Sequence, residues 1–138
     1  EFVLDTAKLF SEKGYINVLV TNAEMELSPF SELLQYIQAM NIDLKYFNEK
    51  SYRIHSKGDM KTVLKNIEYA YKSGKLVEVT HLVVTGINDD VGEFKELVSW
   101  LAGVSPEIPL HISRYFPSYK YNAPPTDIHT LYNFYLIA

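Results

Sequence analysis

Residues 40–45 read Met-Asn-Ile-Asp-Leu-Lys, and apolar and polar side chains alternate at every position of this stretch. Successive side chains of a β-strand point to opposite faces of a sheet, so the alternation predicts a strand with one apolar and one polar face. An antiparallel strand would turn its polar face to water. A strand of a parallel sheet normally has both faces covered by other parts of the protein. Polar side chains on an inner face of such a sheet therefore need a ligand or water as their partner.

Segments with helical periodicity alternate with short β-branched segments on both sides of this stretch. Helices are expected at residues 2–13, 28–37, 61–73, 91–102 and 126–138, with Ser28 and Thr126 as N-caps of the second and the last. Strands are expected at residues 16–20, 40–47, 77–84 and 110–114. Residues 48–60 form a polar connection without clear periodicity. The order is therefore a helix followed by four strand–helix units.

This order predicts an α/β fold in which parallel strands are joined by right-handed crossovers, so that all strand carboxyl ends meet at one rim. Four units are too few for a closed eight-stranded barrel, which takes roughly 200 residues or more. We expect one domain over residues 1–138 that forms a partial parallel βα barrel or a section of a larger one. The chain begins at Glu1 and stops inside an expected helix, so we also expect a fragment of a longer protein.

Composition excludes several classes of protein. The chain is 47% hydrophobic and 22% charged, which is typical of a globular domain. A formal net charge of -4 without a Lys/Arg block argues against nucleic-acid binding. There is no cysteine, and the four histidines lack metal-ligand spacing, so no disulfide and no metal ligand is predicted. No apolar run reaches the roughly 18 residues of a membrane span, and we expect a cytoplasmic protein.

Polar residues follow each expected strand and should gather at the rim, where ligands of open α/β sheets bind. They are Thr21 with Asn22, Asp43 with Lys45, Gly86 with Asn88 and Asp89, and Ser113 with Arg114. Structural roles are the alternatives. The small polar residues could equally serve in turns and helix caps. Asp43 and Lys45 could form a structural ion pair, and Arg114 would be a solvated surface cation if it faced outward.

Several of these segments resemble the radical S-adenosylmethionine (SAM) enzymes in their order and spacing. They are Leu-Val-Thr-Asn at 19–22, residues 40–45, Val-Val-Thr-Gly-Ile-Asn-Asp at 83–89, and residues 111–120. The most specific are Asn-Ile-Asp-Leu-Lys at 41–45 and His-Ile-Ser-Arg-Tyr-Phe-Pro at 111–117. Within that superfamily the chain is most similar to the AmmeMemoRadiSam-system members, which are related to pyruvate formate-lyase activating enzymes.

The resemblance implies a partial barrel of six βα units that binds SAM and a four-iron four-sulfur (4Fe-4S) cluster. In such enzymes a three-cysteine loop holds the cluster and a glycine-rich segment binds the methionine part of SAM. Neither segment is in this chain, which would correspond to the later part of the barrel and be inactive alone. The implied activity of the full-length protein is reductive cleavage of SAM to a 5′-deoxyadenosyl radical, with an unidentified protein or small molecule as substrate. The alternative is a non-catalytic βα scaffold or interaction module.

Matching positions assign specific residues to the SAM site. Asp43 and Lys45 resemble the Asp-x-Lys pair that lines it, and an acceptor beside a cation suits a zwitterionic ligand with hydroxyl groups. Thr80 should face the same side, and Ser113 with Arg114 would reach substrate or the SAM carboxylate. The cofactor-binding residues implied are Thr21, Asn22, Asp43, Lys45, Thr80, Gly86, Ser113 and Arg114; no catalytic residue is singled out.

Three positions depart from the family pattern, which leaves the scaffold alternative open. Ala23 stands where the family has glycine, Thr85 where proline precedes the glycine, and Phe116 where activating enzymes carry a histidine near the SAM methionine. The open side of a partial barrel should also be apolar, so we expect oligomerisation or strand pairing across it.

Overall fold

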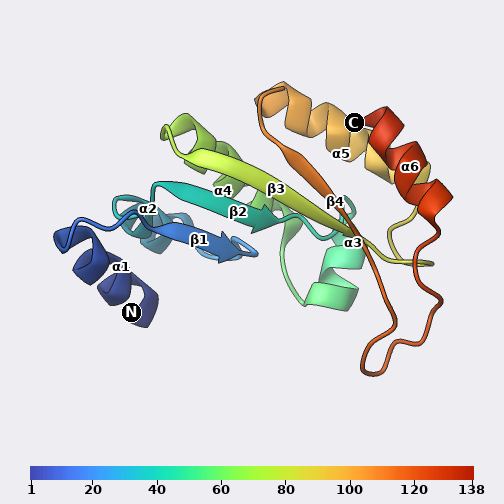
Figure 1. Ribbon diagram of the computed structural model, residues 1–138, viewed down its shortest axis with the longest axis horizontal. Helices are drawn as coiled ribbons and strands as arrows, with labels where there is room; N and C mark the ends of the chain where they lie inside the picture. Colours follow the sequence, from blue (N-terminus) through green and yellow to red (C-terminus); the bar gives the residue numbers. More distant parts are fainter.

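The computed structural model describes residues 1–138 and contains one four-stranded parallel sheet with strand order β1-β2-β3-β4. The strands are β1 (Val18–Thr21), β2 (Ala39–Asp43), β3 (Leu76–Val83) and β4 (Leu110–Arg114). All of them point the same way, so their carboxyl ends meet at one side of the molecule (Figure 1). The expected α/β fold with four parallel strands is confirmed.

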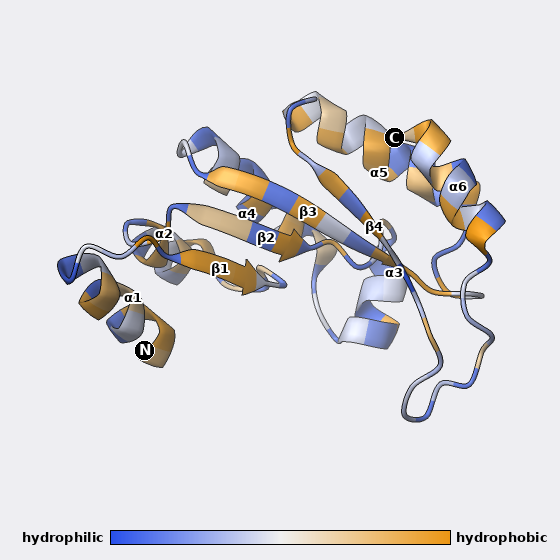
Figure 2. Ribbon diagram, in the orientation of Figure 1, coloured by the Kyte–Doolittle hydropathy of each residue, from blue (hydrophilic) through white to orange (hydrophobic).

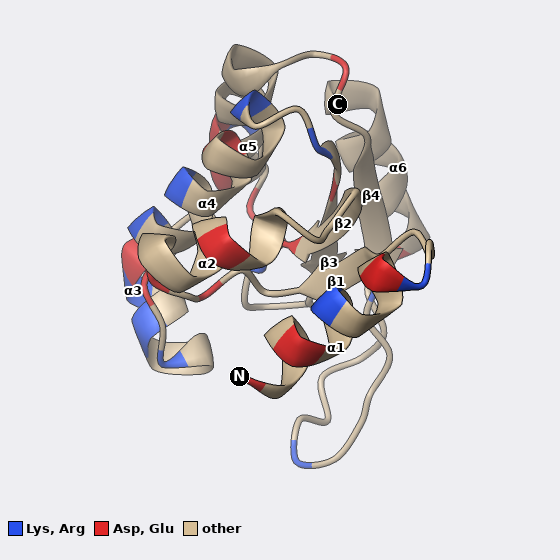
Figure 3. Ribbon diagram, turned by 90° about the vertical axis from the view of Figure 1, so that its left-hand side faces the viewer, with Lys and Arg blue, Asp and Glu red and all other residues tan.

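Helices precede, connect and follow the strands. They are α1 (Phe2–Glu12), α2 (Leu27–Leu34), α4 (Met60–Lys72), α5 (Val91–Val104) and α6 (Ile128–Ile137). Helices α2, α4 and α5 lie on one side of the strands (Figure 3). The connection expected to be irregular holds a short helix, α3 (Glu49–Ser51), followed by a π-helical turn, η1 (Tyr52–Ser56). None of the helices has the length and apolarity that crossing a membrane requires.

Two predicted N-caps are wrong, Ser28 by two positions, since Glu26 is the N-cap of α2, and Thr126 by one. Helix α2 begins at Leu27, before Ser28, which is allowed because a proline in the first turn lacks only an N–H that would have no helical partner. Helix α6 is capped by Asp127, whose carboxylate accepts from the N–H of His129. Thr126 is instead buried and donates its hydroxyl to the carbonyl of Val83, at the end of β3.

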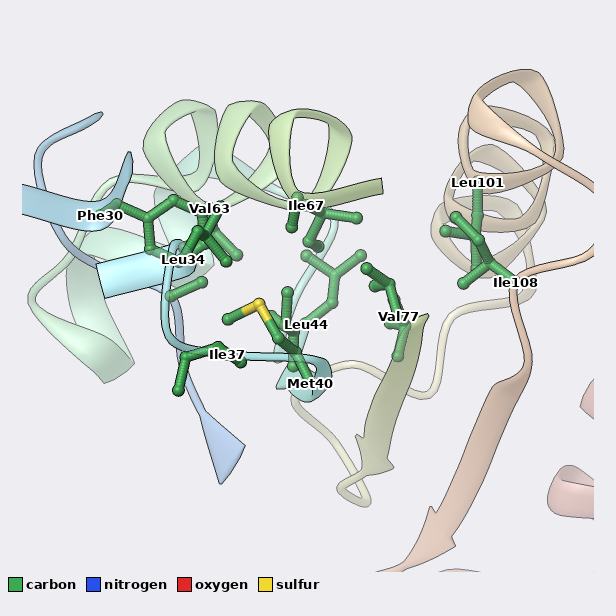
Figure 4. Packing of buried hydrophobic residues seen from close by; sticks show 14 of the residues in the cluster. Phe30, Leu34, Ile37, Met40, Leu44, Val63, Ile67, Val77, Leu101 and Ile108 are labelled. Atoms are coloured by element: carbon green, nitrogen blue, oxygen red, sulfur yellow. The ribbon is translucent and has the colours of Figure 1, made fainter. Parts of the chain in front are cut away.

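The alternation in residues 40–45 sorts their side chains as predicted. Met40, Ile42 and Leu44 are at most 1% exposed, whereas Asn41 and Asp43 are only partly buried. The buried side chains pack beneath α2 and α4, for example against Val63 and Ile67 (Figure 4). A smaller cluster joins β3 to α5 and α6, where the rings of Phe94 and Phe134 stack with centroids 4.0 Å apart.

The opposite, polar face of the sheet is covered by no helix, and we call it the open face. Its rows follow from the parallel register, in which Asn41 lies beside Glu78, Asp43 beside Thr80, and Thr80 beside His111. At the β1 edge this face is apolar, since Val18 and Val20 are 63% and 74% exposed. Figure 2 shows the same apolar colouring along β1. Association across this edge stays a prediction.

Candidate functional site

The candidate site lies on the open face, at the carboxyl ends of the strands, and centres on an ion pair. The ammonium of Lys45 lies 3.0 Å from a carboxylate oxygen of Asp43. The two side chains are 41% and 38% exposed, so the pair is accessible to a ligand and is not an enclosed structural pair. Thr80 lies beside Asp43 in the register and donates its hydroxyl to the carboxamide oxygen of Asn41. The predicted shared face of Asp43 and Thr80 is confirmed.

Asn88 holds the backbone beneath this pair. Its side-chain NH₂ donates to the carbonyls of Lys45 and Leu82, at 2.8 and 2.9 Å, and its oxygen accepts from the N–H of Val84. The residue is 2% exposed. Asn88 therefore ties the segment after β2 to the end of β3, a tertiary role beyond the turn or cap role that the sequence offered.

Tyr52 supports the same segment from the other side. Its phenol oxygen accepts from the N–H of Lys45 at 3.3 Å. Burial raises the pKa of Tyr52 to about 12, so the phenol stays protonated at neutral pH. Sequence reasoning missed this residue because it belongs to η1, where the apolar spacing follows no regular period.

Thr21 and Asn22 fill turn roles. The side chain of Thr21 lies on the helix-covered face, in register with Ile42, and its hydroxyl accepts from the N–H of Ala23. Asn22 accepts from the N–H of Glu24 in the same way. Ala23 adopts φ 52°, in the left-handed region that glycine favours. The loop thus takes a glycine-type conformation although alanine replaces the family's glycine.

A buried asparagine of α4 holds this strained loop. The side-chain NH₂ of Asn66 donates to the carbonyls of Ala23 and Met25, at 2.9 and 2.7 Å. Asn66 is 1% exposed and lies on the apolar stripe of α4 between Val63 and Ile67. A polar residue inside an apolar stripe was the available sequence signal, but nothing in the sequence identified its partners.

Gly86 lies in the turn after β3 and adopts φ 74°, which explains the need for glycine there. Its N–H donates to the carboxylate of Asp89 at 3.1 Å. The loop after β4 also holds the turn, since the hydroxyl of Tyr121 donates to the carbonyl of Thr85. This anchoring fixes the turn although threonine stands where the family has proline.

Ser113 and Arg114 lie on opposite faces of β4. Ser113 pairs with Leu82 and shares the open face with Thr80, whereas Arg114 pairs with Val83 on the helix-covered face. The guanidinium of Arg114 donates to the carbonyl of Thr126 at 2.7 Å and lies 4.9 Å from the ring centroid of Phe116. The structure therefore groups Asp43, Lys45, Thr80 and Ser113 on the open face with Gly86 in the adjoining turn. It directs the side chains of Thr21 and Arg114 elsewhere.

His81 lies behind the site, on the helix-covered face of β3. It is 2% exposed, and its Nδ1 lies 2.8 Å from the carbonyl of Leu44. A carbonyl only accepts, so Nδ1 carries the hydrogen, and the buried Nε2 has no partner. Burial lowers the pKa of His81 from its ordinary 6.5, which keeps the ring neutral in the folded protein.

We expect acid to destabilise the fold through His81. Below pH 6.5 the unfolded chain binds a proton at this residue that the folded chain does not, so the free energy of unfolding falls as pH falls, by at most about 1.4 kcal/mol per pH unit. Urea unfolding between pH 7 and 5 measures the slope. His81→Gln keeps an N–H donor but cannot titrate, and its slope should be smaller. Equal slopes in the two proteins would contradict the assignment.

Comparisons with known proteins bear on this arrangement. Models of known families give no match. An uncharacterised protein from Methanocaldococcus jannaschii is 38% identical over 133 residues, which cover 95% of this chain and 39% of that protein. The chain therefore spans about two fifths of the length of this relative.

Several solved structures have a fold similar to that of this chain. A domain of a pyruvate-formate lyase-activating enzyme from Bacteroides vulgatus matches with a TM-score of 0.78 and 18% identity, over 99% of this chain and 83% of that domain. SuiB from Streptococcus suis matches with a TM-score of 0.71 and 15% identity, over 96% of this chain and 31% of SuiB. A radical SAM methyltransferase from Sphaerobacter thermophilus matches with a TM-score of 0.62 and 13% identity, over 87% of this chain and 36% of the methyltransferase. The chain has the fold of a radical SAM partial barrel.

Proposed function

We propose that this chain contributes part of the SAM site of a longer radical SAM enzyme. The observation that carries the proposal is the accessible Asp43–Lys45 pair on the open face, at the carboxyl end of a central strand. Parallel α/β folds bind ligands at that end of the sheet. The structural neighbours support the superfamily through their fold.

The chemistry of the open face fits SAM. The SAM amino-acid part is a zwitterion and its ribose carries hydroxyl groups, while Asp43 offers an acceptor and Lys45 a cation within one accessible pair. The hydroxyls of Thr80 and Ser113 lie on the same face, and the turn at Gly86 adjoins it. These residues would hold and orient SAM, which supplies a 5′-deoxyadenosyl radical when it is reductively cleaved.

The chain does not fit a 4Fe-4S cluster, because it has no cysteine to supply thiolate ligands. The cluster would therefore be held by residues outside this chain, and the chain alone is not expected to cleave SAM. We further propose that the longer protein has a role like that of the AmmeMemoRadiSam group, or of an activating enzyme with a protein substrate. This part of the proposal rests on the resemblance of residues 41–45 and 111–117.

The test is SAM cleavage by the longer protein. Purified anaerobically and reconstituted with iron and sulfide, it should release 5′-deoxyadenosine from SAM when dithionite is added, and none without the reductant. Chromatography with mass detection measures the product, and visible absorbance reports the cluster. A protein with an intact cluster that yields no 5′-deoxyadenosine would overturn the proposal and favour the non-catalytic scaffold.

A further inference from the structure

A second polar pair lies on the open face, away from the rim. The Nε2 of His111 lies 2.8 Å from a carboxylate oxygen of Glu78, and the side chains are 50% and 38% exposed. The two residues come from neighbouring strands, β4 and β3. No role proposed above for SAM uses either of them.

The register joins this pair to the Asp43 row. Asp43, Thr80 and His111 form one row across β2, β3 and β4, while Asn41 and Glu78 form the next row toward the strand starts. Neighbouring strands lie about 4.8 Å apart, so His111 lies roughly 10 Å from Asp43 across the row. A ligand group bound at the pair would thus lie within a small molecule's length of the rim.

The Glu78–His111 pair offers hydrogen-bond acceptors to a ligand bound on the open face. A carboxylate only accepts, so the Nε2 of His111 carries the hydrogen, and in the neutral ring Nδ1 is left as an acceptor with no partner in the chain. Glu78 has a second carboxylate oxygen free. Asn41 adds its carboxamide oxygen, which receives one hydrogen bond from Thr80 and has a second lone pair.

The charges on this face favour a cation. Its strands and their ends carry Asp43, Lys45 and Glu78 as formally charged residues, and Lys45 is paired with Asp43. Glu78 pairs with no lysine or arginine. The unbalanced charge is therefore negative and lies at the pair. An ammonium group has three N–H donors and a positive charge, which matches acceptors from Glu78, His111 and Asn41.

We propose that Glu78 and His111 form a binding site for a primary amine group of the substrate, on the open face below the SAM rim. The inference rests on the proposed function in taking this face as the inside of a barrel. Glu78 contributes the charge, and its hydrogen bond fixes the tautomer of His111 so that Nδ1 faces the ligand as an acceptor.

The experiment is an NMR titration of the ¹⁵N-labelled 138-residue chain with n-butylamine, which is an ammonium ion at pH 7.5. Amide signals of residues 78–80 and 111–113 should shift, with half-saturation at millimolar concentration. Butyrate has the same alkyl chain and the opposite charge, and it should leave these signals in place. Shifts that are absent, scattered over the protein, or equal with butyrate would overturn the inference.

Two variants make the test specific. Glu78→Gln keeps an acceptor for His111 but removes the charge, and should weaken amine binding about fivefold, the scale of an accessible ion pair. Glu96→Gln removes an exposed charge from α5 and should bind like the parent chain. Unchanged binding by Glu78→Gln would refute the site; if that variant failed to fold, His111→Gln would take its place. Because SAM cleavage is a separate assay, failure of amine binding alone leaves the proposed function standing.

Discussion

Replacing Asn88 with alanine should lower the free energy of unfolding by about 3 kcal/mol. The reason is that three backbone groups, the carbonyls of Lys45 and Leu82 and the N–H of Val84, would lose their partner together. Each buried polar group left without a partner costs about 1–3 kcal/mol, and water entering the gap would recover part of the loss. Urea unfolding monitored by circular dichroism gives the value, and the melting temperature should fall by roughly 10 °C.

Asn22→Ala is the matched control for that prediction. It makes the same chemical change, but Asn22 is exposed and its side chain makes one local hydrogen bond, to the N–H of Glu24. Its cost should be about 1 kcal/mol or less. If the two variants were equally stable, the three hydrogen bonds of Asn88 would not hold the rim together as described.

The order of elements and the two faces of the central strand could be predicted because both depend on local patterns. Alternation in residues 40–45 reports strand geometry directly, and it placed Asp43 correctly on the open face, where Lys45 pairs with it. The same rule limits adjacent residues: of Ser113 and Arg114, only one could face inward. Choosing between them needed the register with β3, which is a tertiary property and places Ser113 on the open face.

The hydrogen bonds that hold the loops could not be predicted, since their partners are far apart in the chain. Asn66 meets Ala23 and Met25 across more than 40 residues, and Asn88 meets Lys45 across 43. Side chains that bind backbone carbonyls recognise no residue type, so the sequence carries no matching signal at the partner. The prediction of Thr126 as the N-cap of α6 failed for a related reason. The hydroxyl of Thr126 donates to the carbonyl of Val83, and the neighbouring Asp127 caps the helix instead.

The largest effect on function should come from the Asp43–Lys45 pair. In the proposed longer radical SAM enzyme, reconstituted with iron and sulfide, Asp43→Asn and Lys45→Met should each weaken SAM binding by about 10–100-fold, the range of a hydrogen bond to a charged group. Anaerobic equilibrium dialysis with labelled SAM measures the dissociation constant. Because the two side chains are 3.0 Å apart, the double variant should lose less than the sum of the single losses.

If the Asp43–Lys45 pair had only a structural role, these substitutions would leave SAM binding unchanged. A second ion pair in the chain provides the control that distinguishes the structural role from cofactor binding. Lys8 and Glu32 lie 3.3 Å apart at comparable exposure on α1 and α2, away from the strand ends. An accessible pair contributes about 0–1 kcal/mol to folding, so both pairs should be nearly neutral for stability. Lys8→Met and Glu32→Gln should leave the affinity for SAM unchanged, whereas the Asp43 and Lys45 variants should lose it while staying folded. SAM affinity that was intact in all four variants would show that Asp43 and Lys45 bind each other and not the cofactor.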